Sequence, residues 1–90
     1  MTQGRASVSE RLRSLLAREK TFKFAPDIGD DVSLRDAGVL DSFGLIALVV
    51  HVEGEFGINV VPEDATFDRF RSVRSIADYV ETKMNADHRR

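Results

Sequence analysis

The segment from Ser42 to Phe56 constrains the fold most, because apolar residues recur along it at helical spacing on two sides. One stripe has the period of an amphipathic helix and is expected to face the core, as such stripes do in nearly every soluble protein. It consists of Leu45, Leu48, Val49, Val52 and Phe56. The second stripe lies on another part of the helix surface and consists of Phe43, Ile46, Ala47 and Val50. A helix that is apolar nearly all round is either enclosed by a large protein or offers one face to a partner.

The size of the chain limits how completely such a helix can be enclosed. With 90 residues the chain forms at most one small domain, which is a poor envelope for total burial. Two interpretations of the second stripe therefore stay open. Either the segment before the helix folds back and covers it, or the stripe is an exposed docking face with the acids Asp41 and Glu53 at its rim.

Capping signals predict two further main helices. Ser7 and Glu10 have the spacing of a capping box, which predicts a first helix over about residues 8–20. Ser72 is expected to cap a last helix, whose apolar residues keep a helical period as far as Met84.

The ends of the central helix and two shorter segments complete the helical pattern. Asp41 or Ser42 can cap the central helix, and Gly57 ends it. Pro62 could open one further turn, and residues 66–70 predict a short helix.

The segment from residue 21 to residue 41 keeps no period and is interrupted by Pro26, Gly29 and Gly38. A connection this long in so small a domain must be functional or pinned to the core. Five apolar residues are candidate pins: Phe22, Phe24, Ile28, Val32 and Leu34.

Together these signals predict an all-α fold with three main helices, one short helix and a long loop between the first two. The domain is expected to span residues 7–84. Residues 1–6 and 85–90 are small or polar, and we expect a flexible N-terminus and a flexible C-terminal tail.

Charge is distributed unevenly along the chain. The formal net charge is −2, but residues 27–68 hold ten acidic residues and one basic residue, a net charge of −9. The remaining residues form two basic ends. The acidic block either serves solvation or forms a surface that attracts a basic partner. It argues against binding to nucleic acid, which needs a basic face.

Groups suited to catalysis or metal binding are scarce. The chain has no cysteine, and its histidines, His51 and His88, have no second ligand at metal-binding spacing. Along a helix axis His51 lies about 13 Å from Ser42, too far to activate its hydroxyl as a base. We therefore predict no metal and no catalytic residue, and we expect His51 to be an exposed helix residue.

Nothing in the sequence predicts membrane insertion. The longest unbroken apolar run covers residues 45–50, far below the roughly 20 residues of a membrane-spanning helix. The N-terminus has no apolar signal segment. We expect a cytoplasmic monomer.

A motif at the start of the central helix resembles the phosphopantetheine-attachment segment of acyl carrier proteins: Gly38-Val39-Leu40-Asp41-Ser42-Phe43-Gly44-Leu45. The order and spacing of the family's elements also match over about residues 8–84. The resemblance implies an acyl-carrier-like four-helix bundle without catalytic activity of its own. It implies Ser42 as the attachment site, to which a phosphopantetheinyl transferase moves 4'-phosphopantetheine from coenzyme A. Acyl or aminoacyl groups are then held on this arm as thioesters.

The resemblance also implies partners and their contact surface. In this family the start of the helix and its second face contact partner enzymes, and the matching positions are Asp41, Phe43, Ile46, Ala47, Val50 and Glu53. The implied partners are the transferase, an acyl- or aminoacyl-loading ligase or transferase, and downstream acceptor enzymes.

The motif Leu-Asp-Ser-Phe-Gly is more similar to stand-alone aminoacyl and D-alanyl carriers, or to carriers of specialised metabolism, than to fatty-acid-synthesis carriers, which have more acids on this helix. Docking should then depend more on apolar contact than on salt. The alternative is a non-catalytic helical interaction domain, which binds a partner through Phe43, Ile46 and Val50 while Ser42 only caps the helix.

Overall fold

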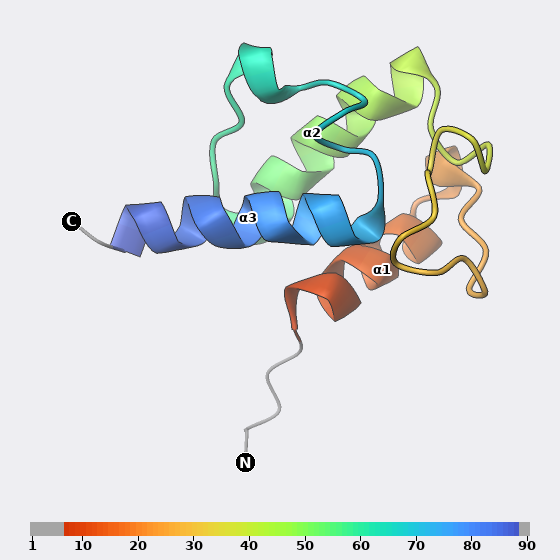
Figure 1. Ribbon diagram of the computed structural model, residues 1–90, viewed down its shortest axis with the longest axis horizontal. Coiled ribbons are helices and arrows are strands. Elements are labelled where there is room, and N and C mark those ends of the chain that lie inside the picture. The colour runs from red at the N-terminus through yellow and green to blue at the C-terminus, as the bar shows by residue number, and fades with distance from the viewer. Residues whose placement is uncertain (1–6, 89–90) are drawn as a thin grey trace.

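Three α-helices, joined by one long loop and one shorter connection, make up the part of the chain that the structure describes. The computed structural model describes residues 7–88, with side chains from 7 to 86. The elements are α1 (Val8–Arg18), the 3₁₀ turn η1 (Lys20–Phe22), α2 (Ser42–Phe56), the 3₁₀ turn η2 (Pro62–Asp64) and α3 (Val73–His88) (Figure 1). No strand occurs among the described residues, which confirms the predicted all-α fold. The predicted flexible segment 1–6 and residues 89–90 of the predicted tail lie outside the described residues.

The start of α1 is the predicted capping box. The Ser7 hydroxyl accepts a hydrogen bond from the Glu10 N–H (3.1 Å), and the Glu10 carboxylate accepts one from the Ser7 N–H (3.2 Å). These bonds satisfy backbone donors that a helix otherwise leaves unpaired at its start. The helix ends at Arg18, slightly before the predicted end.

The ends of α2 are fixed by an aspartate and a glycine. The Asp41 carboxylate accepts the N–H of Gly44 (2.7 Å), so Asp41 is the N-cap and Ser42 the first helical residue. At the other end Gly57 adopts the left-handed conformation (φ 66°) and donates its N–H to the Glu53 carbonyl (2.9 Å).

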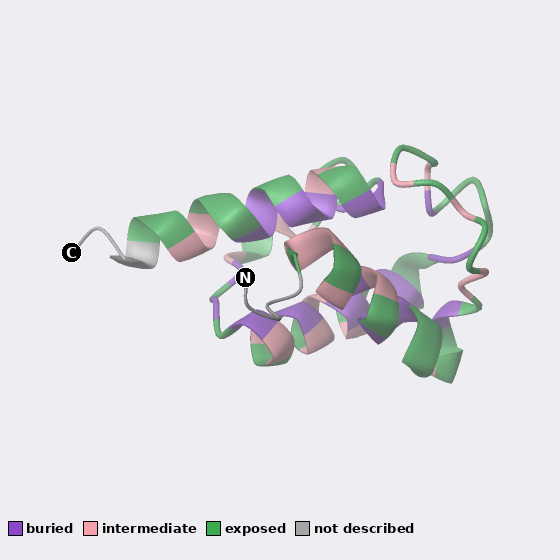
Figure 2. Cartoon of the chain, turned by 90° about the horizontal axis from the view of Figure 1, so that it is seen from below, coloured by how far each residue is buried: buried purple, intermediate pink, exposed green. Residues whose placement is uncertain are grey.

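The stripe predicted to face the core does so. Within α2, Leu48 and Val52 are fully enclosed, Leu45 and Phe56 are buried, and Val49 is half-buried against the core. Figure 2 shows buried positions along the inner sides of the helices and exposed positions along their outer sides. The largest fully buried side chains come from all three helices and both connections: Phe22, Phe70, Leu12, Leu15, Leu16, Leu34, Leu48, Ile76, Val52, Val73 and Val80.

The start of α3 is capped by Ser72, as predicted. The Ser72 hydroxyl accepts the N–H of Ser75 (3.1 Å), and the Ser75 hydroxyl accepts the N–H of Ser72 (2.9 Å). The helix runs to His88, past Met84, the last apolar residue of the predicted period. No glycine or proline follows Met84 to stop the helix.

The connection between α2 and α3 contains less helix than predicted. Pro62 opens the 3₁₀ turn η2, as expected. Residues 66–70, however, form a single turn closed by a bond from the Phe70 N–H to the Thr66 carbonyl (3.0 Å), and not a helix. A segment of five residues that starts with a β-branched threonine has too few backbone bonds to propagate a helix.

Most of the predicted pins hold the long loop to the core. Phe22 and Leu34 are fully buried, and Phe24 and Ile28 are half-buried against the core. The prediction was wrong for Val32, whose side chain is 43% exposed. The loop needs fewer apolar pins than predicted because polar contacts also hold it.

Backbone hydrogen bonds and arginines supply those polar contacts. The Leu34 N–H donates to the Arg71 carbonyl (2.7 Å), and the Arg74 N–H, at the start of α3, donates to the Asp30 carbonyl (2.9 Å). From α1, the Arg13 guanidinium donates to the Asp30 carboxylate (2.7 Å). The loop is therefore tied to both α1 and α3 at the end of the bundle where α2 begins (Figure 1).

The carboxylates of Asp31 and Glu55 form ion pairs between different parts of the fold, so the stability of the protein should depend on pH. Hydrogen bonds from Arg74 lower the pKa of Asp31, and hydrogen bonds from Arg18 and then Arg11 lower the pKa of Glu55. A carboxylate whose pKa is lowered by folding contributes stability above its unfolded pKa and loses it as pH falls through the folded pKa. We expect the free energy of unfolding to decrease as pH falls below the ordinary Glu value of 4.5.

Urea unfolding at several pH values measures this effect. In the variant Glu55→Gln, which cannot titrate at this position, the decrease below that pH should be shallower than in the wild type. Equal slopes in the two proteins would contradict a stabilising role for the ion pairs of Glu55.

Two glycines of α2 should respond differently to alanine. A Cβ at Gly54, which is exposed, would meet no atom within 4 Å, whereas one at Gly44 would lie 3.2 Å from Asp41 Oδ1. We expect Gly54→Ala to stabilise the protein by about 0.5–1 kcal/mol, because alanine loses less backbone entropy in a helix. Gly44→Ala should gain less, since the Asp41 cap must shift. Thermal unfolding measures both changes, and an equal gain would contradict the close packing at Gly44.

Candidate functional site

Ser42 stands exposed in the first turn of α2, beside the residue that caps it. The cap is made by the Asp41 carboxylate, so the Ser42 hydroxyl is not used to close the helix. The first intrahelical bond runs from the Leu45 N–H to the Asp41 carbonyl (2.8 Å). The amides of Ser42 and Phe43 therefore belong to the unpaired donors of the first turn, where the helix dipole is positive. The arrangement favours a negatively charged group at Ser42.

Gly44 fits the helix to the loop beneath it. The residue is buried, and a Cβ would lie 3.7 Å from a Leu40 side-chain carbon and 3.9 Å from the Val39 carbonyl. Both distances are ordinary van der Waals contacts, so the loop packs against the first turn of α2 beside Ser42.

The second apolar stripe is open. The exposed fractions are 80% for Phe43, 66% for Ile46 and 62% for Val50. Ala47, the fourth member, is half-buried and packs against the core. Of the two open interpretations, the covering loop is therefore excluded among the described residues. The apolar residues of the loop that are buried join the core instead.

The two acids predicted at the rim of this stripe both make structural hydrogen bonds. The Asp41 carboxylate caps α2, and the Glu53 carboxylate accepts the N–H of Val60 (2.8 Å) in the chain that leaves α2. Asp41 is exposed, whereas Glu53 is partly covered. The predicted acidic rim is thus partly occupied by contacts within the protein.

Much of the acidic block is likewise paired internally. Four of its carboxylates form ion pairs with arginines from the basic ends of the chain: Asp30 with Arg13, Asp31 with Arg74, Glu55 with Arg11 and Arg18, and Asp64 with Arg69. The ion pairs of Asp30, Asp31 and Glu55 connect α1 and α3 with the long loop and with α2. The pair of Asp64 and Arg69 lies within the connection between α2 and α3. The acidic block therefore stabilises the fold through ion pairs and is only in part available to a partner.

His51 is half-buried, not exposed as predicted. Its ring and the Phe22 ring form a T-shaped pair at a centroid distance of 5.9 Å, and its Nε2 lies 3.8 Å from Glu19 Oε1. These contacts turn His51 toward the end of α1. Within the described part of the chain, no three acidic, histidine or cysteine residues gather in a way that could hold a metal ion. None of the described helices is long and apolar enough to cross a bilayer.

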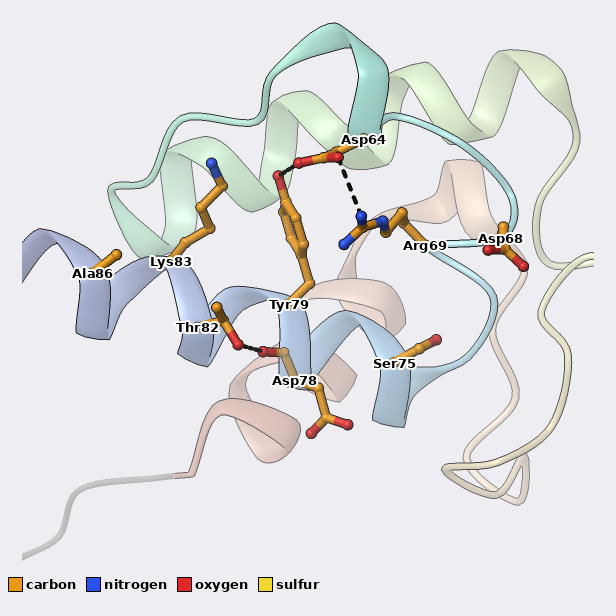
Figure 3. A pocket seen from close by; sticks show the side chains of 9 residues that line it. All are labelled: Asp64, Asp68, Arg69, Ser75, Asp78, Tyr79, Thr82, Lys83 and Ala86. Carbon is orange, nitrogen blue, oxygen red and sulfur yellow. Dashed lines mark hydrogen bonds and ion pairs between the residues drawn. The ribbon is translucent and has the colours of Figure 1, made fainter.

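One polar cluster could not be predicted from the sequence. The Tyr79 hydroxyl of α3 donates to the Asp64 carboxylate of η2 (2.8 Å), and Arg69 and Lys83 flank the tyrosine ring (Figure 3). Burial, followed by the bond to Asp64, raises the pKa of Tyr79 to about 12. The phenol therefore stays protonated and ties η2 to α3 beside an open cavity of about 470 Å³. Tyr79 falls within the apolar period of α3, which concealed its polar role.

Comparison of the chain with known proteins shows the family to which it belongs. The family described as "Phosphopantetheine attachment site" matches residues 10–80, most of the chain. A D-alanyl carrier protein of Abiotrophia defectiva is 34% identical over 56 residues, which cover 62% of this chain and 71% of that protein. A D-alanyl carrier protein of Streptococcus sanguinis is 37% identical over 65 residues, which cover 70% of this chain and 82% of that protein.

The chain therefore belongs to the phosphopantetheine-binding carrier proteins. Carrier proteins of this family bear a covalently attached 4'-phosphopantetheine and are in general not catalytic. The first turn of α2 fits such a group, because it presents an exposed hydroxyl at the positive end of a helix dipole while Asp41 supplies the cap.

Proposed function

We propose that Ser42 is the attachment residue for 4'-phosphopantetheine in this carrier protein. The observation that carries the proposal is the division of roles at the start of α2, where Asp41 caps the helix and Ser42 stays exposed. The alternative is an interaction domain that binds a partner through the stripe while Ser42 only caps the helix. It assigns the cap to Ser42, whereas the Asp41 carboxylate accepts the Gly44 N–H. The bound arm supplies the thiol for thioester formation, which a chain without cysteine cannot supply.

Intact mass spectrometry tests the proposal. The protein is incubated with coenzyme A and a broad-specificity phosphopantetheinyl transferase, and we expect a mass gain of one arm per chain. A chain that stays unmodified while a known carrier protein is modified in the same mixture would overturn the proposal.

We propose an aminoacyl group as the cargo, with D-alanine the first candidate, because the relatives reported above are D-alanyl carrier proteins. The chain itself contributes presentation and not chemistry: none of its described side chains forms a nucleophile–base pair at Ser42. A loading ligase therefore activates the amino acid, and an acceptor enzyme removes it. We propose that attachment of the arm and loading take place in the cytoplasm, where coenzyme A is available.

Incubation of the modified protein with ATP and a D-alanine-activating ligase tests the cargo. D-alanyl thioester should form faster than L-alanyl thioester or a fatty acyl thioester. Preferential fatty acylation would contradict the proposed cargo.

We propose that partner enzymes dock on the first turn and second stripe of α2. The surface consists of Asp41, Phe43, Ile46, Ala47, Val50 and Glu53, with the exposed Phe43, Ile46 and Val50 at its centre. Contiguous exposed apolar side chains mark interaction sites in soluble proteins. Because Asp41 and Glu53 already hold backbone amides, apolar contact should contribute more to docking than charge does.

Because apolar contact is expected to contribute more to docking than charge, the loading rate should depend only weakly on salt. We expect the loading rate to fall by less than about threefold between low and physiological ionic strength, since apolar contacts are not screened. Steady-state kinetics at a fixed ligase concentration measures this dependence. A decrease of about tenfold or more would show that charge steering dominates instead.

A further inference from the structure

Two of the described arginines, unlike the others, form no ion pair with a carboxylate. Five arginines form ion pairs with carboxylates: Arg11, Arg13, Arg18, Arg69 and Arg74. Arg35 and Arg71 have no carboxylate partner within the described part of the chain, although both belong to or border the acidic block. In a protein that pairs its other described arginines internally, these two guanidiniums remain available to a ligand.

The two free guanidiniums line one hollow. Its volume is about 290 Å³, and its other lining residues are Ser33, Asp36, Phe67 and Asp68. The Arg35 guanidinium lies over the Phe67 ring, 4.5 Å from the centroid. Stacking on an aromatic ring holds the guanidinium plane in place and leaves the N–H donors at its edge free to bind an oxyanion.

Backbone hydrogen bonds place both arginines at the end of the bundle that holds Ser42. The Leu34 N–H donates to the Arg71 carbonyl (2.7 Å), and the carbonyl of Leu34, directly before Arg35, accepts the N–H of Leu40 (3.2 Å). From Leu40 the chain reaches Ser42 in two residues, a span of at most about 7 Å. The backbone of Arg35 thus directly follows a residue bonded to Leu40, and the backbone of Arg71 is joined to the same residue, Leu34.

We propose that Arg35 and Arg71 bind the phosphodiester that attachment at Ser42 brings to this end of the molecule. The proposal rests on the proposed attachment site. Guanidinium groups bind phosphate oxygens through paired, charge-assisted hydrogen bonds, and two of them can share one phosphodiester. The arm would then leave the protein in a restricted direction, set by the loop and the start of α3.

Three carboxylates near the arginines repel the phosphodiester and therefore weaken its binding. Asp36 and Asp68 line the same hollow, and Asp41 precedes Ser42. The Asp41 carboxylate is held by the Gly44 N–H, and neither Asp36 nor Asp68 forms an ion pair with the two arginines. The formal charges of Arg35, Arg71, Asp36 and Asp68 cancel. Binding therefore depends on hydrogen-bond geometry more than on a net positive field, and a modest, salt-sensitive contact is expected.

Phosphorus NMR of the modified full-length protein tests the contact. Wild type, the double variant Arg35→Gln/Arg71→Gln and the control Lys20→Gln are each modified with coenzyme A and the transferase, and intact mass verifies one arm per chain. In wild type and Lys20→Gln, the ³¹P resonance should move with increasing salt as the ion pair is screened. In the double variant the resonance should start at a different position and should not move. Circular dichroism verifies that the double variant is folded.

The outcomes distinguish the arginine site from attachment at Ser42. A modified double variant with the wild-type ³¹P resonance and the wild-type salt response would overturn the arginine site and leave attachment at Ser42 intact. A wild-type chain that gains no mass would overturn the attachment site itself. The variant Asp36→Asn removes a repelling carboxylate from the hollow, so it should enlarge the salt response of the ³¹P resonance. A decrease would also count against the arginine site.

Discussion

Replacement of Ser42 by alanine is expected to abolish the mass gain on incubation with coenzyme A and a phosphopantetheinyl transferase. The loss should be complete, because in the proposed function the phosphate is bonded to the hydroxyl oxygen of Ser42. Stability should change by less than about 0.5 kcal/mol, since the exposed hydroxyl does not cap the helix and alanine is a good helix former. Intact mass and urea unfolding measure the two effects on the same sample.

The neighbouring variant Asp41→Ala is the matched control for this prediction. Removal of the N-cap carboxylate should cost about 0.5–2 kcal/mol of stability, because the Gly44 N–H loses its partner. Attachment should slow but still occur. If Ser42→Ala destabilised the protein as much as Asp41→Ala and left the mass gain intact, Ser42 would be a structural residue only.

Introduction of a carboxylate into the second stripe is expected to disrupt partner docking. The variant Val50→Asp places a charge among exposed apolar side chains, where a docked enzyme would have to bury it without a partner. We expect kcat/KM for loading by the ligase to fall by about tenfold or more, the scale of an interface hot spot. Because Val50 is 62% exposed, the fold and its unfolding midpoint should change little.

The variant Val32→Asp makes the same chemical change at an exposed valine outside the stripe. Val32 lies on the long loop and is 43% exposed, so its replacement adds the same charge to the protein. Its loading rate should stay within about twofold of the wild type. An equal loss of rate in both variants would mean that net charge, and not the stripe, controls loading.

Short-range signals in the sequence were sufficient to predict the starts of the two helices that flank α2. The capping pair of Ser7 and Glu10 was predicted from spacing alone, as was the cap at Ser72, because each depends on residues three apart. The second stripe was recognised as unusual for a small domain. Whether the loop covers it depends on contacts distant in sequence, and only the structure shows the exposed Phe43.

Features that depend on long-range contacts could not be predicted. The carboxylate of Glu53 was assigned to a docking rim, but it holds the N–H of Val60 in the chain that follows the helix. Tyr79 follows the apolar period of α3, yet its hydroxyl meets Asp64 of a distant turn. The pairing of arginines with the acidic block, and the exclusion of Arg35 and Arg71 from it, likewise arises only in three dimensions.

Identification of the modified residue in the wild-type protein tests the central claim most directly. The protein is modified with coenzyme A and the transferase, digested, and sequenced by tandem mass spectrometry under conditions that preserve the phosphodiester. We predict that every modified fragment carries the arm on Ser42 and that other hydroxyl residues, including Ser33, Ser72 and Ser75, stay unmodified. An arm found on any of those residues, or a Ser42 peptide that remains fully unmodified, would contradict the account.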